Sequence, residues 1–248
     1  MINDIIKIIQ EAGIELIKIY LGNDFDIVYK QDNSPLTRAD SISNDIIIKG
    51  LKKISHFPII TEESPISYTL RKNWKKFWLV DPLDGTKDFI AKNGEFTLNI
   101  ALIEDNAPIL GVVLVPFTKD LYYATKGGGA YKNGKKIYNF SKRDKLIASD
   151  SNFHSSQMTK DFFMKHDIKQ VQRYGSSLKI CKLAEGVIDI YPRLNGTKEW
   201  DTAASHIIAN ESGCKLIDIE TNQELLYNKI NIQNNFFIAS RNNLELTI

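Results

Sequence analysis

Four acidic residues of this 248-residue chain fall where strands are expected to end or helices to begin. They are Glu62, Asp81, Asp84 and Asp201. In layered α/β proteins, ligand sites form at strand ends and helix N-termini. Carboxylates at such places suit Mg²⁺, which uses few protein ligands and completes its shell with water and substrate phosphate. Any one of these acids alone would usually be a turn residue or a helix cap, so only their grouping indicates a site.

Residues 78–86, Trp-Leu-Val-Asp-Pro-Leu-Asp-Gly-Thr, give the strongest local indication of chemistry. Asp81 and Asp84 are three residues apart across a proline-stiffened turn, so both carboxylates can point toward one ion. Gly85 permits a positive φ or a close backbone approach. Thr86 can cap a short helix whose free N–H groups face an anion. The segment therefore predicts a cradle for a metal ion and a phosphate group.

Three segments resemble motifs of the inositol monophosphatase superfamily. Asp-Pro-Leu-Asp-Gly-Thr at 81–86 resembles the superfamily signature, and Thr-Glu-Glu-Ser at 61–64 resembles its Glu-Glu motif. Glu-Trp-Asp-Thr-Ala-Ala at 199–204 resembles its Trp-Asp motif. The three motifs occur in the same order over nearly the whole chain. The resemblance implies a Mg²⁺-dependent phosphomonoesterase with an α/β fold, a layered α-β-α-β-α sandwich.

The resemblance also implies a role for each matching residue. Two or three Mg²⁺ ions would be held by the carboxylates of Glu62, Asp81, Asp84 and Asp201 and by the backbone carbonyl of Leu83. Thr37 and Asp40 match the family's T-x-x-D element. Asp40 would pair with Thr86, and with Glu62 would orient a water for in-line attack on phosphorus without a covalent intermediate. Read from the residues alone, Thr37 and Asp40 are also the capping box of a helix, and both roles hold together. Glu63 is expected to lie behind or outside the site.

Four further runs resemble the 3′(2′),5′-bisphosphate nucleotidases of the same superfamily. They are Thr-Lys-Asp-Phe at 86–89, Asn-Gly-Glu-Phe-Thr at 93–97, Gly-Ser-Ser-Leu-Lys at 175–179 and Tyr-Pro-Arg at 191–193. The resemblance implies hydrolysis of adenosine 3′,5′-bisphosphate to AMP and phosphate, linked to sulfur metabolism and inhibited by Li⁺. It also makes 3′-phosphoadenosine 5′-phosphosulfate a further candidate substrate.

The substrate would lie between the metal ligands and the second half of the chain. At the metal end, its contacts would be Glu62, Leu83, Asp84, Gly85, Thr86 and Asp201. At the other end, Gly175, Ser176 and Lys179 open an expected helix and would contact a second phosphate or the ribose. On the residues alone, this run could equally be a plain helix cap, with Lys179 a solvated lysine. An inositol or sugar phosphatase, and a non-catalytic regulator that binds metal and nucleotide, are the alternatives.

Apolar patterns divide the chain into two halves, residues 1–140 and 141–248. In the first half, helices are expected at 2–20 and 37–54, and strands at 27–30, 57–60, 77–80, 96–103, 109–115 and 121–125. In the second half, strands are expected at 146–149, 168–173 and 187–191, and helices at 156–165, 176–185 and 202–211. A strand meander followed by alternating strands and helices predicts layers of sheets and helices.

Composition and charge argue against several other classes of function. With 32 basic and 30 acidic residues, the net charge is +2, which does not favour nucleic acid as a partner. Cys181 and Cys214 have no zinc or disulfide spacing and suit a reducing compartment. Charged residues interrupt the apolar pattern near the N-terminus, so neither a signal peptide nor a transmembrane span is expected. We expect a cytoplasmic enzyme acting on a small phosphorylated nucleotide; peripheral membrane association and the choice between monomer and homodimer stay open.

Overall fold

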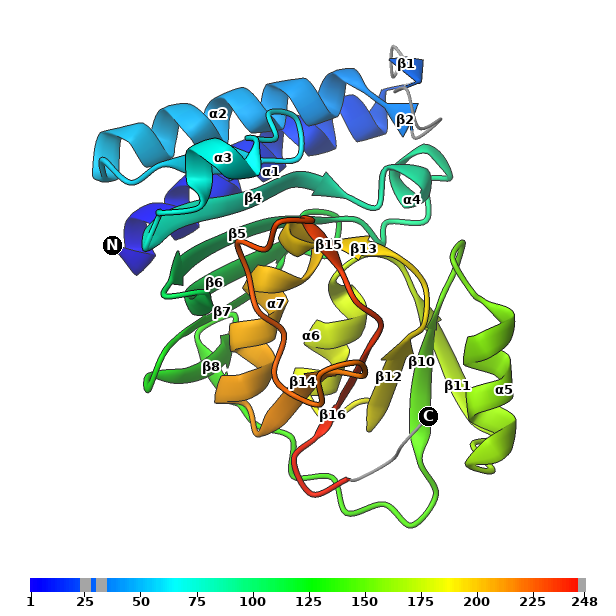
Figure 1. The fold of residues 1–248 in the computed structure, drawn as a ribbon. Helices are drawn as coiled ribbons and strands as arrows, with labels where there is room; N and C mark the ends of the chain where they lie inside the picture. The colour runs from blue at the N-terminus through cyan, green and yellow to red at the C-terminus, as the bar shows by residue number, and fades with distance from the viewer. Residues whose placement is uncertain (23–27, 30–34, 245–248) are drawn as a thin grey trace.

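A computed structural model of the chain describes residues 1–22, 28–29 and 35–244. Helices and sheets alternate in five layers (Figure 1). From one side to the other, the layers are α1 (Ile2–Leu21) with α2 (Arg38–Ile54), a seven-stranded sheet, α6 (Leu178–Ala184) with α7 (Glu199–Glu211), a five-stranded sheet, and α5 (Gln157–Lys165). The predicted α-β-α-β-α sandwich is therefore confirmed.

The seven-stranded sheet has its strands in sequence order. They are β3 (Ile59–Thr61), β4 (Lys76–Asp84), β5 (Thr97–Glu104), β6 (Ala107–Val115), β7 (Asp120–Thr125), β8 (Gly129–Lys132) and β9 (Lys135–Ile137). In β4, Phe77 and Leu79 pack in the core shared with α6 and α7, whereas Trp78 and Val80 pack under α1 and α2. Both faces of β4, β5 and β6 are covered, so these strands are nearly continuous buried runs, whereas β8 and β9 at the edge are mostly half-buried or exposed.

The five-stranded sheet has the order β11-β10-β12-β16-β14. These strands are β10 (Ile147–Ser151), β11 (Gln170–Tyr174), β12 (Ile190–Arg193), β14 (Cys214–Asp218) and β16 (Phe237–Arg241). The first three are mutually parallel, and β16 runs antiparallel to both of its neighbours. Neither β14 nor β16 was predicted, because no strand pattern was assigned after residue 211.

Two short strand pairs and two short helices complete the described elements. They are β1 (Val28–Tyr29) with β2 (Pro35–Leu36), β13 (Thr197–Lys198) with β15 (Gln233–Asn234), α3 (Tyr68–Arg71) and α4 (Thr86–Ile90). The ends of the strand predicted at 27–30 lie outside the described residues. The connection between β9 and β10 contains the predicted boundary, and division of the chain at residue 140 stays a prediction.

Two helices of the middle layer differ from their predicted bounds. Helix α7 begins at Glu199, three residues earlier than predicted, because the Asp201 carboxylate accepts the Lys198 N–H at 2.8 Å and closes the first turn. Helix α6 begins at Leu178, two residues later than predicted, because Ser176 has a φ of +44° and cannot belong to the helix.

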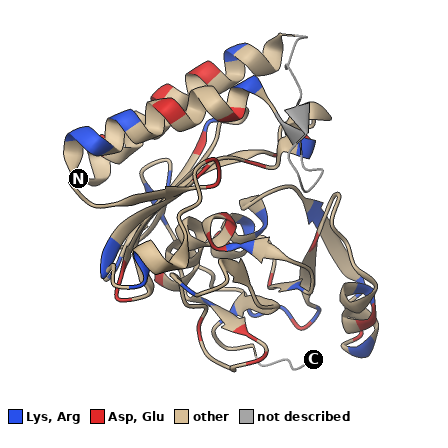
Figure 2. Ribbon diagram, turned by 45° about the horizontal axis from the view of Figure 1, so that its top comes forward, with Lys and Arg blue, Asp and Glu red and all other residues tan. Residues whose placement is uncertain are grey.

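Most charged side chains of the described residues are exposed or half-buried. Figure 2 shows acidic and basic residues interspersed along α1 and α2. Among the described residues, every helix is too short or too polar to cross a bilayer.

Helix α7 lies very close to the seven-stranded sheet at Gly111 of β6. A Cβ atom added there would lie 2.3 Å from the Ala204 carbonyl oxygen and 2.6 Å from a methyl group of Ile207. The first neighbour is backbone of α7 and cannot rotate away. Glycine is therefore required at this position for space, and the contact sets the height of α7 above the sheet.

Substituting Gly111→Ala should lower the free energy of unfolding by about 1–3 kcal/mol, the usual scale of overpacking in a core. Urea denaturation would measure the change. Gly22→Ala is the control, since Gly22 is exposed at the end of α1 with a φ of −72° and a Cβ there would lie 3.1 Å from the Ile19 carbonyl oxygen, a much looser contact, so it should cost clearly less stability than Gly111→Ala. Equal stability of the Gly111 variant and the wild type would contradict the close approach.

Candidate active site

Glu62 and Asp81 lie side by side because β3 and β4 are parallel. Thr61 is in register with Val80, and the Glu62 N–H donates to the Val80 carbonyl at 3.1 Å. Glu62 therefore follows the carboxyl end of β3 and lies beside Asp81 near the carboxyl end of β4, the edge at which ligand sites form in such sheets. The prediction that these acids lie at strand ends or helix starts holds for Glu62 after β3, for Asp84 as the last residue of β4 and for Asp201 in the first turn of α7. Asp81 differs, because β4 continues through it to Asp84.

A bulge in β4 brings Asp84 toward the same place. The register of β4 against β5 shifts between Asp81 and Asp84, and the Leu83 N–H donates to the Asp81 carboxylate at 3.1 Å. Such an irregularity turns side chains away from their regular alternation. Gly85 then takes a φ of +88° and precedes α4 as its N-cap. Thr86 is the first residue of α4, so the prediction that Thr86 caps the helix is wrong.

Asp201 reaches the cluster from the first turn of α7, and Ser177 connects it to Asp84. The Ser177 N–H donates to Asp84 Oδ2 at 2.7 Å. The Ser177 hydroxyl lies 3.0 Å from the same oxygen and 2.6 Å from the Asp201 carbonyl oxygen. A residue before α6 thus joins the two halves of the acid cluster.

The pKa values of the clustered acids are raised by burial and by one another. Burial raises the pKa of Asp81 well above its ordinary value, and the charges of Glu62, Asp84 and Asp201 raise it further. Burial, followed by the charge of Asp84, raises the pKa of Asp201 to about 8. The pKa of Asp84 is also raised by burial, although Lys179 and the hydrogen bonds from Ser177 oppose the shift. The structure therefore gathers acids that repel one another strongly.

Asp40, a residue of α2, lies next to Thr86 and is almost completely buried. Its Oδ2 accepts the N–H and the hydroxyl of Thr37, each at 2.7 Å, which confirms the predicted capping box. The Thr86 hydroxyl lies 3.4 Å from Asp40 Oδ1 and 3.4 Å from the Leu83 carbonyl oxygen. Burial is the main reason that the pKa of Asp40 rises to about 7, with smaller contributions from the charges of Glu63 and Glu62.

The run 175–179 is ordered by contacts within the protein. The Gly175 N–H and the Ser176 hydroxyl donate to Glu95, through its carboxylate at 2.8 Å and its carbonyl at 3.1 Å. The Lys179 ammonium donates to the carbonyl oxygens of Tyr174 and Ser176 at 3.1 and 2.7 Å. Lys179 is therefore a buried lysine and not a solvated one, and burial is the main cause that lowers its pKa to about 8.

A cavity of about 410 Å³ collects most of the predicted site residues. Those lining it are Glu62, Asp81, Leu83, Asp84, Gly85, Thr86, Ser176, Lys179 and Asp201. Asp40 and Gly175 stand behind the wall and are not among the lining residues. The volume lies within the range of about 300–1,000 Å³ usual for small-molecule sites.

Among the lining residues that sequence reasoning did not single out are Ser177, His154 and Arg193. Arg193 is buried, its Nη2 donates to the Gly196 carbonyl at 3.0 Å, and its Nε has no hydrogen-bond partner among the described residues. Burial, then the charges of Arg193 and Lys87, lowers the pKa of His154 to about 4, so its imidazole is neutral near pH 7. Runs 175–179 and 191–193 were signals for Ser177 and Arg193, whereas nothing marked His154.

The donor atoms at the acid end of the cavity suit Mg²⁺. Four carboxylates and the Leu83 carbonyl are hard oxygen donors, and their mutual repulsion would be relieved by a cation. In the described residues, no three His, Cys, Asp or Glu side chains are already arranged as a metal-binding group. Asp84 and Asp201 accept hydrogen bonds from Ser177 and Lys198 instead. These carboxylates have the chemistry to hold a metal ion in place of those hydrogen bonds.

The model of the inositol monophosphatase family matches residues 2–248 of this chain. The chain belongs to the inositol monophosphatase family. A relative from Buchnera aphidicola subsp. Acyrthosiphon pisum, named 3′(2′),5′-bisphosphate nucleotidase CysQ, is 41% identical over 87% of this chain and 83% of its own length. The protein of the same name from Escherichia coli strain K12 is 39% identical over 88% of this chain and 90% of its own length.

Solved structures of the family have the same architecture. The crystal structure of CysQ from Bacteroides thetaiotaomicron superposes with a TM-score of 0.87 at 37% identity, over 97% of each chain. An IMPase from Thermotoga maritima superposes with a TM-score of 0.81 at 24% identity, over 96% of this chain and 90% of its own. At 24% identity, the similarity to the Thermotoga maritima structure shows a shared fold only.

The raised pKa of Asp201 should make the metal-free protein less stable as pH rises. Between the ordinary carboxyl pKa of about 4 and the folded value of about 8, the folded chain keeps a proton that the unfolded chain releases. The contribution of Asp201 to the free energy of unfolding is therefore fully present below about pH 4 and is lost as the pH rises through about 8. In EDTA, the melting temperature should fall between pH 6 and 9, and Asp201→Asn should reduce that fall.

Asp45→Asn, which changes an exposed aspartate of α2, is the matched control and should leave the pH dependence as in the wild type. Some fall should remain in the Asp201 variant, because Asp40 also has a raised pKa. Identical pH dependence of the wild type and Asp201→Asn would contradict the burial and crowding of Asp201.

Proposed function

We propose that this chain is a Mg²⁺-dependent 3′(2′),5′-bisphosphate nucleotidase that hydrolyses adenosine 3′,5′-bisphosphate to AMP and phosphate. One observation carries the proposal: the cavity has four acids at one end and two buried cations, Lys179 and Arg193, in its wall. A substrate with two phosphates suits such a cavity, one phosphate for a metal cluster and one for fixed positive charge. Identities of 37–41% to proteins named CysQ support the same substrate class.

In this proposal, Mg²⁺ is held by Glu62, Asp81, Asp84, Asp201 and the Leu83 carbonyl, and the family resemblance implies two or three ions per site. The cytoplasmic location is proposed from the N-terminal residue pattern and the cysteine usage. Bound Mg²⁺ would neutralise the phosphoryl charge, lower the pKa of a water and stabilise the leaving alkoxide. Glu62 and Thr86 orient the water toward phosphorus. The Thr86 hydroxyl donates to Asp40 once the Leu83 carbonyl, its other acceptor at 3.4 Å, is engaged by the metal, and its oxygen then accepts a hydrogen bond from the water.

The second phosphate is assigned to the wall that contains Arg193 and Lys179. Arg193 has an unpartnered Nε and an always-charged guanidinium, which suits a phosphate. Lys179 contributes charge from a fixed position because two carbonyl oxygens hold its ammonium. Lys179 also orders the turn before α6, so replacing it would disturb Ser177 as well as the charge. Arg193 is therefore the cleaner residue for a substitution.

Thr86→Ala should lower kcat by about 100-fold or more, because it removes a group that positions the nucleophile. The Mg²⁺ dependence of the melting temperature should stay close to that of the wild type. Steady-state phosphate release and thermal melts over a Mg²⁺ series would measure the two quantities. Thr118→Ala, at an exposed turn of the first sheet, is the control. Near-normal turnover in Thr86→Ala would remove the Thr86 and Asp40 pair from the mechanism.

Adenosine 3′,5′-bisphosphate should have a kcat/KM at least about tenfold above that of 3′-AMP or inositol phosphate, since a charge-assisted contact contributes about 1.5–3 kcal/mol. Arg193→Gln should reduce this preference mainly by raising KM for the bisphosphate. Arg173→Gln, which changes an exposed arginine of β11, should leave the preference intact. Equal efficiency of the wild type on inositol phosphate would favour the inositol phosphatase alternative.

A further inference from the structure

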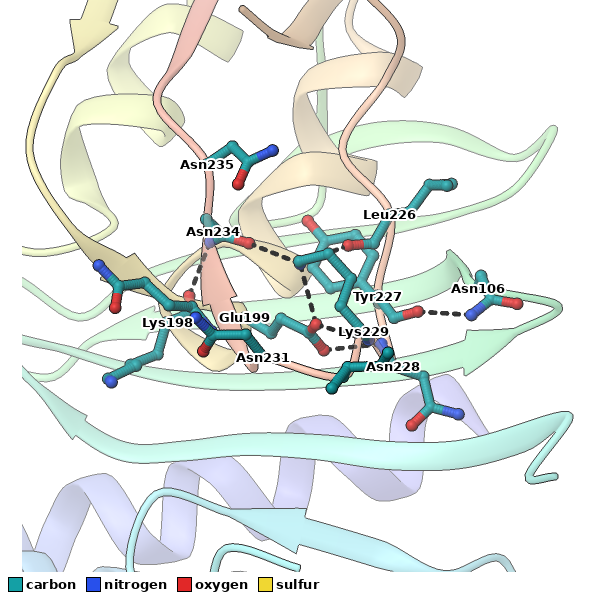
Figure 3. Close-up of polar contacts among 12 residues, drawn as sticks. Asn106, Lys198, Glu199, Leu226, Tyr227, Asn228, Lys229, Asn231, Asn234 and Asn235 are labelled. Carbon is teal, nitrogen blue, oxygen red and sulfur yellow. Dashed lines mark hydrogen bonds and ion pairs between the residues drawn. The ribbon is translucent and has the colours of Figure 1, made fainter. Parts of the chain in front are cut away.

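The first residue of α7, Glu199, has a completely buried carboxylate. Its oxygens accept the Asn228 N–H at 2.7 Å and the Lys229 N–H at 3.0 Å, and the Lys229 ammonium lies 2.9 Å away. Figure 3 shows Glu199 pointing toward the segment 226–234. A buried charge is tolerated only when it is paired and hydrogen-bonded, and here three donors from two consecutive residues supply that environment.

The segment 226–234 in turn holds the residues immediately before and at the start of α7. The Ile232 carbonyl accepts the Glu199 N–H at 2.9 Å. The Asn234 amide donates to the Lys198 carbonyl at 2.9 Å, and β15 pairs with β13 at the same place. Lys198 is the residue whose N–H donates to the Asp201 carboxylate at 2.8 Å. The segment 226–234 therefore contacts Lys198, the residue that is itself hydrogen-bonded to Asp201.

The opposite side of the segment 226–234 is bonded to the chain that follows Glu62. Arg71 Nη1 donates to the Asn228 side-chain oxygen at 2.8 Å, and the Asn228 amide donates to the Arg71 carbonyl at 3.0 Å. Arg71 Nε also donates to the Ile66 carbonyl at 3.0 Å. At the β5–β6 turn, the Asn106 side-chain amide donates to the Tyr227 carbonyl at 2.6 Å, and the Tyr227 N–H donates to the Asn106 carbonyl at 3.0 Å. The segment is thus fixed to the sheet that carries Glu62 and Asp81.

We propose that Glu199 is a positioning residue: through Asn228 and Lys229, it fixes the start of α7 to the first sheet and so sets the place of the Asp201 carboxylate relative to Glu62 and Asp81. Acids that share one ion must keep their separation within narrow limits, and Asp201 is the member that comes from the other half of the chain. Glu199 acts through Asp201 and does not line the cavity itself. The inference rests on the proposed metal site.

The test uses Glu199→Gln, which keeps the size of the side chain but removes its charge and one accepting oxygen. The melting temperature is recorded over a Mg²⁺ series, starting from EDTA, and gives the Mg²⁺ concentration of the half-maximal shift. We expect this midpoint to rise by about 10-fold, the usual scale for losing a residue that orients a metal ligand. With saturating Mg²⁺, KM for the bisphosphate nucleotide should change by less than about twofold, since the second-phosphate wall is untouched.

Glu211→Gln is the matched control at the opposite end of the same helix. The Glu211 carboxylate also accepts two backbone N–H groups, from Gly127 and Gly129 at 2.7 and 2.8 Å, and anchors a turn. Its loss should lower stability without moving the Mg²⁺ midpoint by more than about twofold, as expected for a merely structural anchor. Lys229→Gln is a milder second variant, in case Glu199→Gln does not fold, and should shift the midpoint in the same direction.

An unchanged midpoint in Glu199→Gln, or in Lys229→Gln where that variant is used, overturns the inference. Equal shifts in the Glu199 and Glu211 variants overturn it as well, because the effect would then be general loosening of α7. A wild type without any Mg²⁺-induced shift overturns it together with the metal site. Since the midpoint is read from melting, failure of the nucleotide as substrate shows in a different experiment.

Discussion

Mutual repulsion among four crowded acids, of which Asp81 is buried and the others are half-buried, is the constraint on which the rest of the site depends. Bringing carboxylates together away from water raises the free energy of their charged forms twice, by desolvation and by repulsion. The protein offsets this with donors fixed in its backbone: Leu83 for Asp81, Ser177 for Asp84 and Lys198 for Asp201. Lys179 adds positive charge near Asp84. Each donor sits at the end or edge of an element, where backbone N–H groups are free.

The layered architecture provides these element ends at one place. Parallel pairing of β3 and β4 aligns Glu62 with Asp81, and the bulge in β4 adds Asp84. Helix α7 must then bring Asp201 from the other side of the sheet, which it does as a nearly fully buried helix in the middle layer. A buried helix can begin with two acids only if both carboxylates have hydrogen-bond donors. The Lys198 N–H donates to Asp201, and the N–H groups of Asn228 and Lys229 in the segment 226–234 donate to Glu199.

The sequence predicted what depends on neighbouring residues and failed where the partners are distant. Asp81 and Asp84 could be grouped because a short stiff turn separates them, and Thr37 with Asp40 because a capping box is local. The metal-ligand roles came from resemblance and stay predictions. The engagement of Gly175 and Ser176 by Glu95, about 80 residues earlier, left no trace in either segment. The chain after residue 211, in which no strand was predicted, forms β14 and β16 and contains the hydrogen-bond partners of Glu199. These features could not be predicted, because the segment 226–234 makes its contacts with distant parts of the chain, in α7, α3 and the β5–β6 turn.

The place of β16 in the second sheet has a consequence for how the molecule assembles. Of the five strands in that sheet, β16 is the last in sequence, yet it lies between β12 and β14. Before β16 inserts, β14 has no neighbour in the sheet, and β12 presents an open edge beside Arg193. Phe237 of β16 pairs with Arg193 and itself lines the cavity. The cavity wall that contains Arg193 is thus completed only when β16 pairs with β12, a contact between residues more than 40 positions apart, and long-range strand pairing of this kind is slow to form.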